Sequence, residues 1–302
     1  MINRAIFSIF KEGSKTYFYS SIFFPTYIKK DVFTLYGFVR KADNYVDSIP
    51  QNVNEFYEFK EKYYKAINGK KTDDIVINLF ANLVRKKDFD PKWVEAFFKS
   101  MEMDIKKSTY NTINETLEYI YGSAEVIGLM MGKIMNLSEE SFTCAKYLGR
   151  AMQYINFIRD IAEDVKLDRV YFPQTDLKKF GIERLDHDYI LDHHDKFTQF
   201  IKKQLLYYCD WQSIAEEGFK YIPKRYLIPV KTASEMYNWT AEQIFKDPMI
   251  VYVKKVKPQV SKIVSTTIMN IIDPKSPKRK NLLPCLVKSP QPKLEYYFSK
   301  NK

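Results

Sequence analysis

The stretch QYINFIRDIAED, residues 153–164, decides the fold of this chain. A helix turns by about 100° per residue, which places Gln153, Asn156, Asp160 and Asp164 within about 80° of one another. The positions between them are mostly Tyr, Ile and Phe. This pattern predicts a largely buried helix with one polar stripe, on which two carboxylates stand one turn apart.

A second stripe of the same kind occurs in LYGFVRKADNYVD, residues 35–47. Here Tyr36, Arg40, Asp43 and Asp47 fall within about 60° of one another on a helix. Apolar neighbours again indicate a helix that is buried on its other faces. The chain thus has two D-x-x-x-D stripes, and one of them also carries an arginine.

Each stripe taken alone has an ordinary interpretation, a solvated helix face. Like charges four residues apart oppose helix formation, however, and buried carboxylates need a counter-charge. Mg²⁺ takes about six oxygen ligands and commonly shares them between carboxylates and phosphates. Two such stripes in one chain therefore favour a site for Mg²⁺ and a diphosphate, with Arg40 and nearby lysines neutralising the remaining phosphate charge.

The rest of the sequence predicts an all-α fold with one continuous core. Only 9 glycines occur, none after Gly218, and no segment alternates apolar and polar residues convincingly. There is no GxGxxG or GxxxxGK[ST] phosphate loop. The 45 Tyr and Phe residues either fill the core or line an apolar cavity. Helical spacing predicts helices over residues 31–49, 53–67, 72–87, 91–107, 112–135, 138–165, 187–218 and 224–246, with short ones at 176–181 and from Pro248.

The net charge of +11 belongs to one end of the chain. Residues 1–250 hold 36 basic and 35 acidic side chains, whereas residues 251–302 hold 12 basic and 2 acidic ones. A near-neutral body argues against nucleic-acid binding. Five prolines and many lysines predict a flexible tail over residues 273–302 after a domain at 1–272. We expect this tail to be a solvated segment or a peripheral contact to anionic membranes.

Other features exclude several classes of protein. No apolar run approaches the 18 residues of a membrane span, and the first residues lack a signal-peptide pattern. Cys144, Cys209 and Cys285 are far apart, which indicates neither disulfides nor a thiolate zinc site. The three histidines are not predicted metal ligands. We therefore expect a cytoplasmic protein that associates with membranes, if at all, through its tail.

With these residues in view, the chain resembles the squalene/phytoene synthase family of head-to-head prenyl transferases, and it looks most like the prokaryotic phytoene synthases. The match runs in order through roughly residues 12–258. Its most specific part, residues 148–173, resembles L-G-x-A-x-Q-x-x-N-x-x-R-D-x-x-E-D-x-x-x-x-R-x-Y-x-P. Further parts of the match are Ser14-Lys15-Thr16-Tyr17, residues 35–47, Met101 to Asp104 with Tyr110, and residues 119–128.

The resemblance implies a single-domain helical bundle of the isoprenoid synthase type with a central cavity. Its reaction would join two prenyl diphosphates, most simply geranylgeranyl diphosphate, through a cyclopropylcarbinyl diphosphate to phytoene, with release of diphosphate. The alternative is a squalene or dehydrosqualene synthase that uses farnesyl diphosphate. Two or three Mg²⁺ ions would be required, and NADPH only for squalene.

The resemblance also implies roles for individual residues. The predicted metal-binding residues are Asp43, Asp47, Asn156, Asp160 and Asp164. The predicted diphosphate-binding residues are Ser14, Lys15, Arg40, Gln153, Asn156, Arg159 and Lys254. The predicted catalytic residues are Tyr36, Arg40, Tyr119 and Tyr171. Two tyrosines, Tyr119 and Tyr171, have a purely structural alternative in the core, and Arg159 has one in an ion pair with a neighbouring acid.

Four features leave open questions. Asn44 stands where the family usually has a second Asp, and metal binding should survive because Asp43 and Asp47 remain. Glu125 replaces a common Gly and lies either near the cavity or on the surface. Tyr237, together with Lys254 or Lys255, resembles the Tyr…Arg pair that the family has near its C-terminus. Small residues at 124, 128 and 132 leave one helix face bare, for close helix packing or for a prenyl tail.

Overall fold

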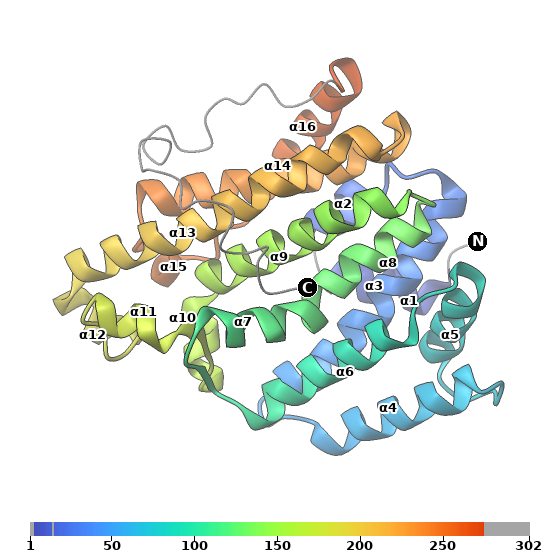
Figure 1. The fold of residues 1–302 in the computed structure, drawn as a ribbon, viewed down its shortest axis with the longest axis horizontal. Helices are drawn as coiled ribbons and strands as arrows, with labels where there is room; N and C mark the ends of the chain where they lie inside the picture. The colour runs from blue at the N-terminus through green and yellow to red at the C-terminus, as the bar shows by residue number, and fades with distance from the viewer. Residues whose placement is uncertain (1–2, 14, 275–302) are drawn as a thin grey trace.

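The computed structural model describes residues 3–13 and 15–274, and this part of the chain is almost entirely helical (Figure 1). The predicted tail lies outside the described residues from position 275 onward, as does Ser14. The helices are α1 (Arg4–Gly13), α2 (Lys15–Ser21), α3 (Thr26–Asp47), α4 (Val53–Ile67), α5 (Ile75–Lys87), α6 (Pro91–Lys106), α7 (Ile113–Ile120), α8 (Val126–Ile134), α9 (Phe142–Arg159), α10 (Ile161–Asp164), α11 (Gln174–Lys179), α12 (His187–Asp192), α13 (His194–Glu217), α14 (Lys224–Lys246), α15 (Ile250–Val253) and α16 (Val260–Ile272).

The core consists of two buried apolar clusters that meet around α9. One cluster joins α1 and α3 to α6 with α8, and the other joins α7, α9, α13 and α14. In Figure 1, α9 crosses the middle of the molecule between α13 and α8, which are the helices it packs against most extensively. Because the two carboxylate stripes lie on α3 and on α9 with α10, this arrangement turns them toward the same interior space.

Close helix packing explains the small residues between α7 and α9. A Cβ added at Gly128 would lie 2.2 Å from the carbonyl oxygen of Ala145, and one at Gly149 would lie 2.3 Å from that of Ala124. A π-helical turn at Tyr121–Glu125 separates α7 from α8, and Gly122 lets it approach α6. The bare face therefore serves helix packing, while Ala124 and Gly128 also line the interior cavity.

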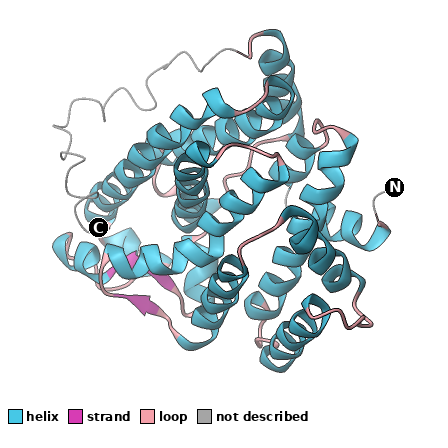
Figure 2. Ribbon diagram, turned by 45° about the vertical axis from the view of Figure 1, so that its right-hand side comes forward, coloured by secondary structure: helices cyan, strands magenta, loops and turns pink. Residues whose placement is uncertain are grey.

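The structure differs from the predicted elements in several places. Two short strands, β1 (Thr109–Tyr110) and β2 (Val170–Pro173), pair in parallel, shown in magenta in Figure 2. The predicted helix over 138–165 is interrupted, since α9 ends at Arg159 and Asp160 has φ −101° and ψ 14°. The sequence reading missed α1, α2 and α16. Within the described ranges, no helix is long and apolar enough to cross a membrane.

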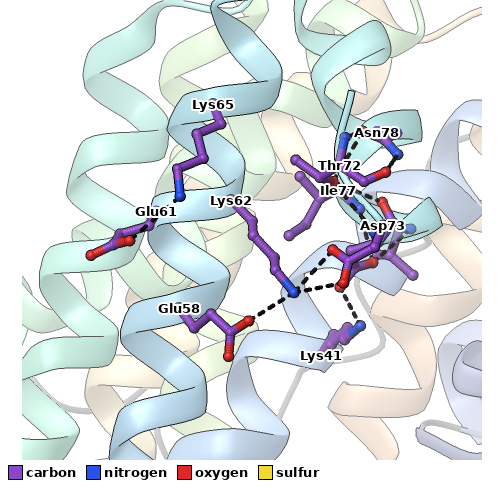
Figure 3. A network of polar contacts seen from close by, with 11 residues as sticks. Lys41, Glu58, Glu61, Lys62, Lys65, Thr72, Asp73, Ile77 and Asn78 are labelled. Carbon is purple, nitrogen blue, oxygen red and sulfur yellow. Dashed lines mark hydrogen bonds and ion pairs between the residues drawn. The ribbon is translucent and has the colours of Figure 1, made fainter. Parts of the chain in front are cut away.

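An ionic network fixes the outer face of α3 to α4 and to the start of α5 (Figure 3). The Lys41 Nζ lies 2.5 Å from Asp74, which also accepts hydrogen bonds from the first backbone amides of α5. Lys62 on α4 pairs with Glu58 at 2.8 Å and with Asp73 at 3.0 Å. Each exposed pair contributes little alone. The Lys41–Asp74 pair joins α3 to the start of α5, and the Lys62–Asp73 pair joins α4 to the residues just before α5.

Candidate active site

A cavity of about 740 Å³ lies between the two core clusters. Its size falls within the usual range of small-molecule sites. One part of its wall carries the carboxylates and cations of α3, α9 and α10. The rest is largely apolar, with contributions from Phe10, Val32, Leu35, Ile127, Met131, Met135, Leu148, Phe219, Ile222 and Val230. The cavity thus combines an ionic region with a long apolar one.

All four residues of the first stripe line this cavity. They lie on α3, a helix of 22 residues without interruption. Asp47 Oδ1 accepts a hydrogen bond from Arg169 Nη1 at 2.8 Å. Burial, together with the nearby Asp47 charge, raises the pKa of Asp43 to about 8 despite the presence of Arg40. A carboxylate in this state requires either a proton or a cation beside it.

The second stripe also lines the cavity, from Gln153 to Asp164, although the helix is interrupted at Asp160 within it. Arg159 forms a bidentate ion pair with Asp160, with distances of 2.7 and 2.6 Å. Burial acts to raise the pKa of Asp160, but Arg159 and Lys255 leave it below its ordinary value. Burial and the Asp160 and Asp47 charges raise the pKa of Asp164. The two stripes therefore face each other closely enough for their charges to interact.

Asn156 carries an independent sign of a missing polar partner. Its Oδ1 is buried and has no hydrogen-bond partner among the described residues. The residue lines the cavity one turn before Asp160. An amide oxygen that lost its water on folding without gaining a donor is costly. A bound cation or a hydrogen-bonding ligand would satisfy it.

Asp104, from α6, is a central residue of the site to which the sequence reading gave no role. Its two carboxylate oxygens accept hydrogen bonds from the hydroxyls of Tyr119 and Tyr171, each at 2.7 Å. Burial raises the pKa of Asp104 to about 6, although Arg169 and the two hydroxyls act in the opposite direction. Arg169 also donates to the carbonyl oxygens of Val46 and Asp104. This network joins α3, α6, α7 and β2.

The three tyrosines predicted to be catalytic are buried or half-buried, and all of them line the cavity. The Tyr171 ring stacks on Phe157 with centroids 4.2 Å apart and lies 4.9 Å from the Tyr119 ring. The hydroxyls of Tyr119 and Tyr171 both donate to Asp104, so the rings of these two residues, rather than their hydroxyls, remain for contact with a ligand. Tyr36 stacks on Phe10 at 3.9 Å.

The cations at the cavity differ partly from the prediction. Arg40, Arg159 and Arg169 line it, and so do three lysines, Lys166, Lys255 and Lys257. Of these lysines, the sequence pattern points only to Lys255. Lys254 is exposed and is not part of the lining. Its backbone is extended, with φ −158° and ψ 152°, so successive side chains point in opposite directions and Lys255 takes the inward place. Lys255 pairs with Asp160 at 3.3 Å and also with Glu163.

Glu125 lies neither at the cavity nor on the surface, because it is 2% exposed within the π-helical turn and pairs with Arg150 at 2.6 Å. Lys15 is the first residue of α2. The carboxylates do not converge as a set of three or more that could hold a metal ion by themselves, as far as the structure describes the chain.

Comparison with known proteins identifies the class to which this fold and site belong. The arrangement is the isoprenoid synthase fold, a helical bundle around a cavity with two facing carboxylate stripes. The squalene/phytoene synthase family model matches residues 10–263. The chain therefore belongs to the squalene/phytoene synthase family, a family of prenyltransferases, and the resemblance inferred from its motifs is confirmed.

Relatives and solved structures agree with this assignment. The chain is 27% identical over 245 residues to "Phytoene synthase, chloroplastic" of Daucus carota, covering 77% of this chain and 61% of the carrot protein. It is 25% identical over 202 residues to "4,4'-diapophytoene synthase" of Staphylococcus haemolyticus, covering 64% and 70%. The crystal structure of a dehydrosqualene synthase in complex with ligand matches with a TM-score of 0.76 at 21% identity, covering 90% of this chain and 95% of the other.

Proposed function

We propose that this protein joins two molecules of geranylgeranyl diphosphate head to head and releases diphosphate to form phytoene. The observation that carries the proposal is the pair of facing stripes, in which Asp43 and Asp164 have raised pKa values beside an apolar cavity. Such a site accepts a cation, an anionic head group and a long hydrocarbon tail. The phytoene synthase relatives support this substrate class.

Mg²⁺ is the cation that fits this set of donors. The donors are hard oxygens, namely the carboxylates of both stripes and the unsatisfied Asn156 Oδ1. Mg²⁺ is commonly bound through one or two carboxylates plus substrate phosphates, which agrees with a site whose carboxylates do not close around an ion alone. When bound, it would supply charge that stabilises the departing diphosphate. Asp43, Asp47, Asp160 and Asp164 would hold it.

The chain's own cations would hold the rest of the diphosphate charge. Arg40 and Arg159 line the cavity with Lys255 and Lys257. A diphosphate that displaces the Asp160 carboxylate from Arg159 and Lys255 would gain two donors and leave Asp160 available to a metal ion. Burial and neighbouring cations lower the pKa of Lys257. An anion at this position would therefore favour the protonated Lys257.

The apolar part of the cavity would protect the reactive intermediates. Ionisation of the first C–O bond gives an allylic cation, whose C1 bonds to the double bond of the second molecule. Loss of a proton then closes a cyclopropylcarbinyl diphosphate. This ionises in turn, rearranges and loses a second proton to give phytoene. The rings of Tyr119, Tyr171 and Phe157 offer π faces to the cations, and the apolar wall excludes water that would capture them.

The alternative is a reaction with farnesyl diphosphate that gives dehydrosqualene or, with hydride from NADPH, squalene. The observation that favours it is the similarity to a 4,4'-diapophytoene synthase and to a dehydrosqualene synthase structure. The chemistry at the two stripes is the same in both cases. The two proposals differ in the length of the tail that the apolar part of the cavity accepts.

One experiment tests both proposals. Purified protein is incubated with Mg²⁺ and either the C15 or the C20 diphosphate, with and without NADPH, and the hydrocarbon is identified by mass. We expect a C40 product from the C20 substrate, no product when Mg²⁺ is chelated, and none from an Asp43→Asn/Asp164→Asn variant. A C30 product alone would favour the alternative. Absence of diphosphate release from either substrate would contradict the whole proposal.

A further inference from the structure

The last described helix, α16, has more exposed than buried apolar residues. Its buried residues are Ile263, Thr267 and Asn270, two of which are polar. Its exposed apolar residues are Val264, Ile268, Met269, Ile271 and Ile272, and the last of these is 72% exposed. Lys262 is its one charged residue. Soluble surfaces rarely carry such a continuous apolar face without a partner.

A second exposed apolar segment lies beside it, at the turn between α2 and α3. Helix α16 packs on both α2 and α14, at the edge of the molecule opposite α4 in Figure 1. Asn270 donates to Thr232 of α14 at 3.2 Å, less than two turns from Tyr226, which forms a 2.5 Å hydrogen bond with Tyr27. The apolar corner, as we call it, consists of Ile22, Phe23, Tyr27, Ile268, Met269, Ile271 and Ile272.

The chain on either side of the α2–α3 turn and around Tyr226, which adjoins the apolar corner, contributes to the cavity wall. Ser20, Ser21 and Phe24, on either side of the exposed pair in sequence, line the cavity wall. Ile222 and Pro229, on either side of Tyr226, line it as well. Only this short thickness of chain therefore separates the apolar part of the cavity from the exposed corner.

The charges around the corner are mainly basic. Lys30, Lys220, Lys224 and Arg225 are exposed there, and the Arg225 guanidinium lies 5.6 Å from the centre of the Tyr27 ring. The carboxylates near this edge are Glu217, at the end of α13, Asp273, directly after α16, and the half-buried Glu235 of α14. Glu235 accepts a hydrogen bond from Asn270 at 2.7 Å and lies 3.9 Å from Lys231. Residues 275–302, which follow α16, hold eight Lys or Arg and one acidic residue in the sequence. Tyr and Arg beside an apolar face are typical of residues at a membrane interface.

We propose that the apolar corner docks on an anionic lipid bilayer, with the side chains of α16 and the α2–α3 turn entering the interface. Apolar burial would supply one part of the affinity, and the basic residues would supply the other. Docking would place the apolar part of the cavity next to the membrane. The passage of prenyl substrate and hydrocarbon product at this point rests on the proposed function, whereas the docking itself does not.

The experiment measures flotation of the full chain with vesicles, without any prenyl diphosphate. Vesicles of phosphatidylcholine with phosphatidylglycerol are compared with vesicles of phosphatidylcholine alone. The test variant is Ile268→Gln/Ile272→Gln, and the matched control is Leu191→Gln, on α12, where Leu191 is 54% exposed. We expect the wild type and the control to bind the anionic vesicles and the double variant to bind about tenfold more weakly, since burial of two isoleucines in lipid is lost.

Several results would overturn the proposal. One is a double variant that binds like the wild type, and another is full-chain binding that depends on residues 275–302 but not on Ile268. A third is a wild-type protein that does not bind vesicles but forms a dimer, while the double variant is monomeric. That result would show that a second copy of the chain covers the apolar corner. Phe23→Ser repeats the test on another element if the double variant does not fold. If the wild-type protein binds the vesicles but makes no hydrocarbon from prenyl diphosphates, only the proposed function is contradicted.

Discussion

The stripes on α3 and on α9 with α10 have the same carboxylate spacing but different local structure. Asp43 and Asp47 lie on one continuous helix. Asp160 lies at the interruption between α9 and α10 and is not helical, whereas Asp164 is the last residue of α10. The first stripe is therefore fixed by its own helix, whereas the second is fixed by the ion pairs of Asp160 with Arg159 and Lys255.

Each stripe nevertheless divides its two carboxylates in the same way. One is held by an arginine, which is Arg169 for Asp47 and Arg159 for Asp160. The pKa of the other is raised, and this holds for Asp43 and for Asp164. Carboxylates with the same spacing along the chain therefore need not have the same role. Within each pair, the carboxylate that forms no ion pair with an arginine in the described part of the chain is the stronger candidate for direct contact with a metal ion.

Removal of those two carboxylates should have the largest effect. We expect Asp43→Asn and Asp164→Asn each to lower kcat by at least about 100-fold, because each removes a carboxylate that would hold the cation whose charge stabilises the departing diphosphate. The measurement is diphosphate release at saturating Mg²⁺. Asp73→Asn, in the outer network of Figure 3, is the matched control and should retain activity. Equal activity in all three variants would contradict a role for Asp43 and Asp164 in holding the metal ion.

The two arginines should differ in how much they contribute to stability. Arg169→Met leaves the buried Asp104 and the Asp47 carboxylate without their shared cation, and we expect a loss of roughly 3–5 kcal/mol in the free energy of unfolding. Arg159→Met should cost less, about 1 kcal/mol, because Lys255 still pairs with Asp160. Urea unfolding of both variants checks this. Equal losses of unfolding free energy in the two variants would mean that Arg169 and Arg159 stabilise the fold equally.

The raised pKa of Asp43 predicts a pH dependence of stability without metal. Between about pH 4, where an unfolded Asp loses its proton, and pH 8, the folded chain retains a proton on Asp43 that the unfolded chain has lost. Unfolding free energy should therefore fall as pH rises through this range. Millimolar Mg²⁺ should raise the melting temperature by about 2 °C or more at pH 8 and less at pH 5.

Asp43→Asn is the control for that measurement. Its melting temperature should depend less on pH across this range and respond less to Mg²⁺, because the group that exchanges its proton for the ion is gone. A wild-type melting temperature that Mg²⁺ shifts equally at both pH values would contradict this account.

The sequence predicted both stripes because helical periodicity alone places residues four apart on one face. It could not assign a role to Asp104, because only tertiary packing brings α6 against Tyr119 and Tyr171. It also named Lys254 as the diphosphate-binding lysine, whereas Lys255 lines the cavity, because the backbone just after α15 is extended. Local pattern thus predicts faces of helices, and packing decides which side chains meet.

The missed elements have physical reasons as well. Helix α2 has only seven residues, and such a short helix depends on its packing against α14 and α16 rather than on its own propensity. Helix α16 is rich in Ile, Val and Thr, which are weaker helix formers. It also lacks a side-chain N-cap. The strand Val170–Pro173 is too short to show alternation before its partner is known.

The smallest effect should come from restoring the residue in which the first stripe departs from its family. Asn44 is exposed and does not line the cavity, although it lies beside Asp43 in sequence. On a helix the next residue points about 100° away. Asn44→Asp should therefore change kcat/KM by no more than about twofold, the range of an ordinary surface substitution. A gain of tenfold or more, measured with the same Mg²⁺ titration, would show that the substrate-bound site recruits position 44 and that the arginine-based division of roles is incomplete.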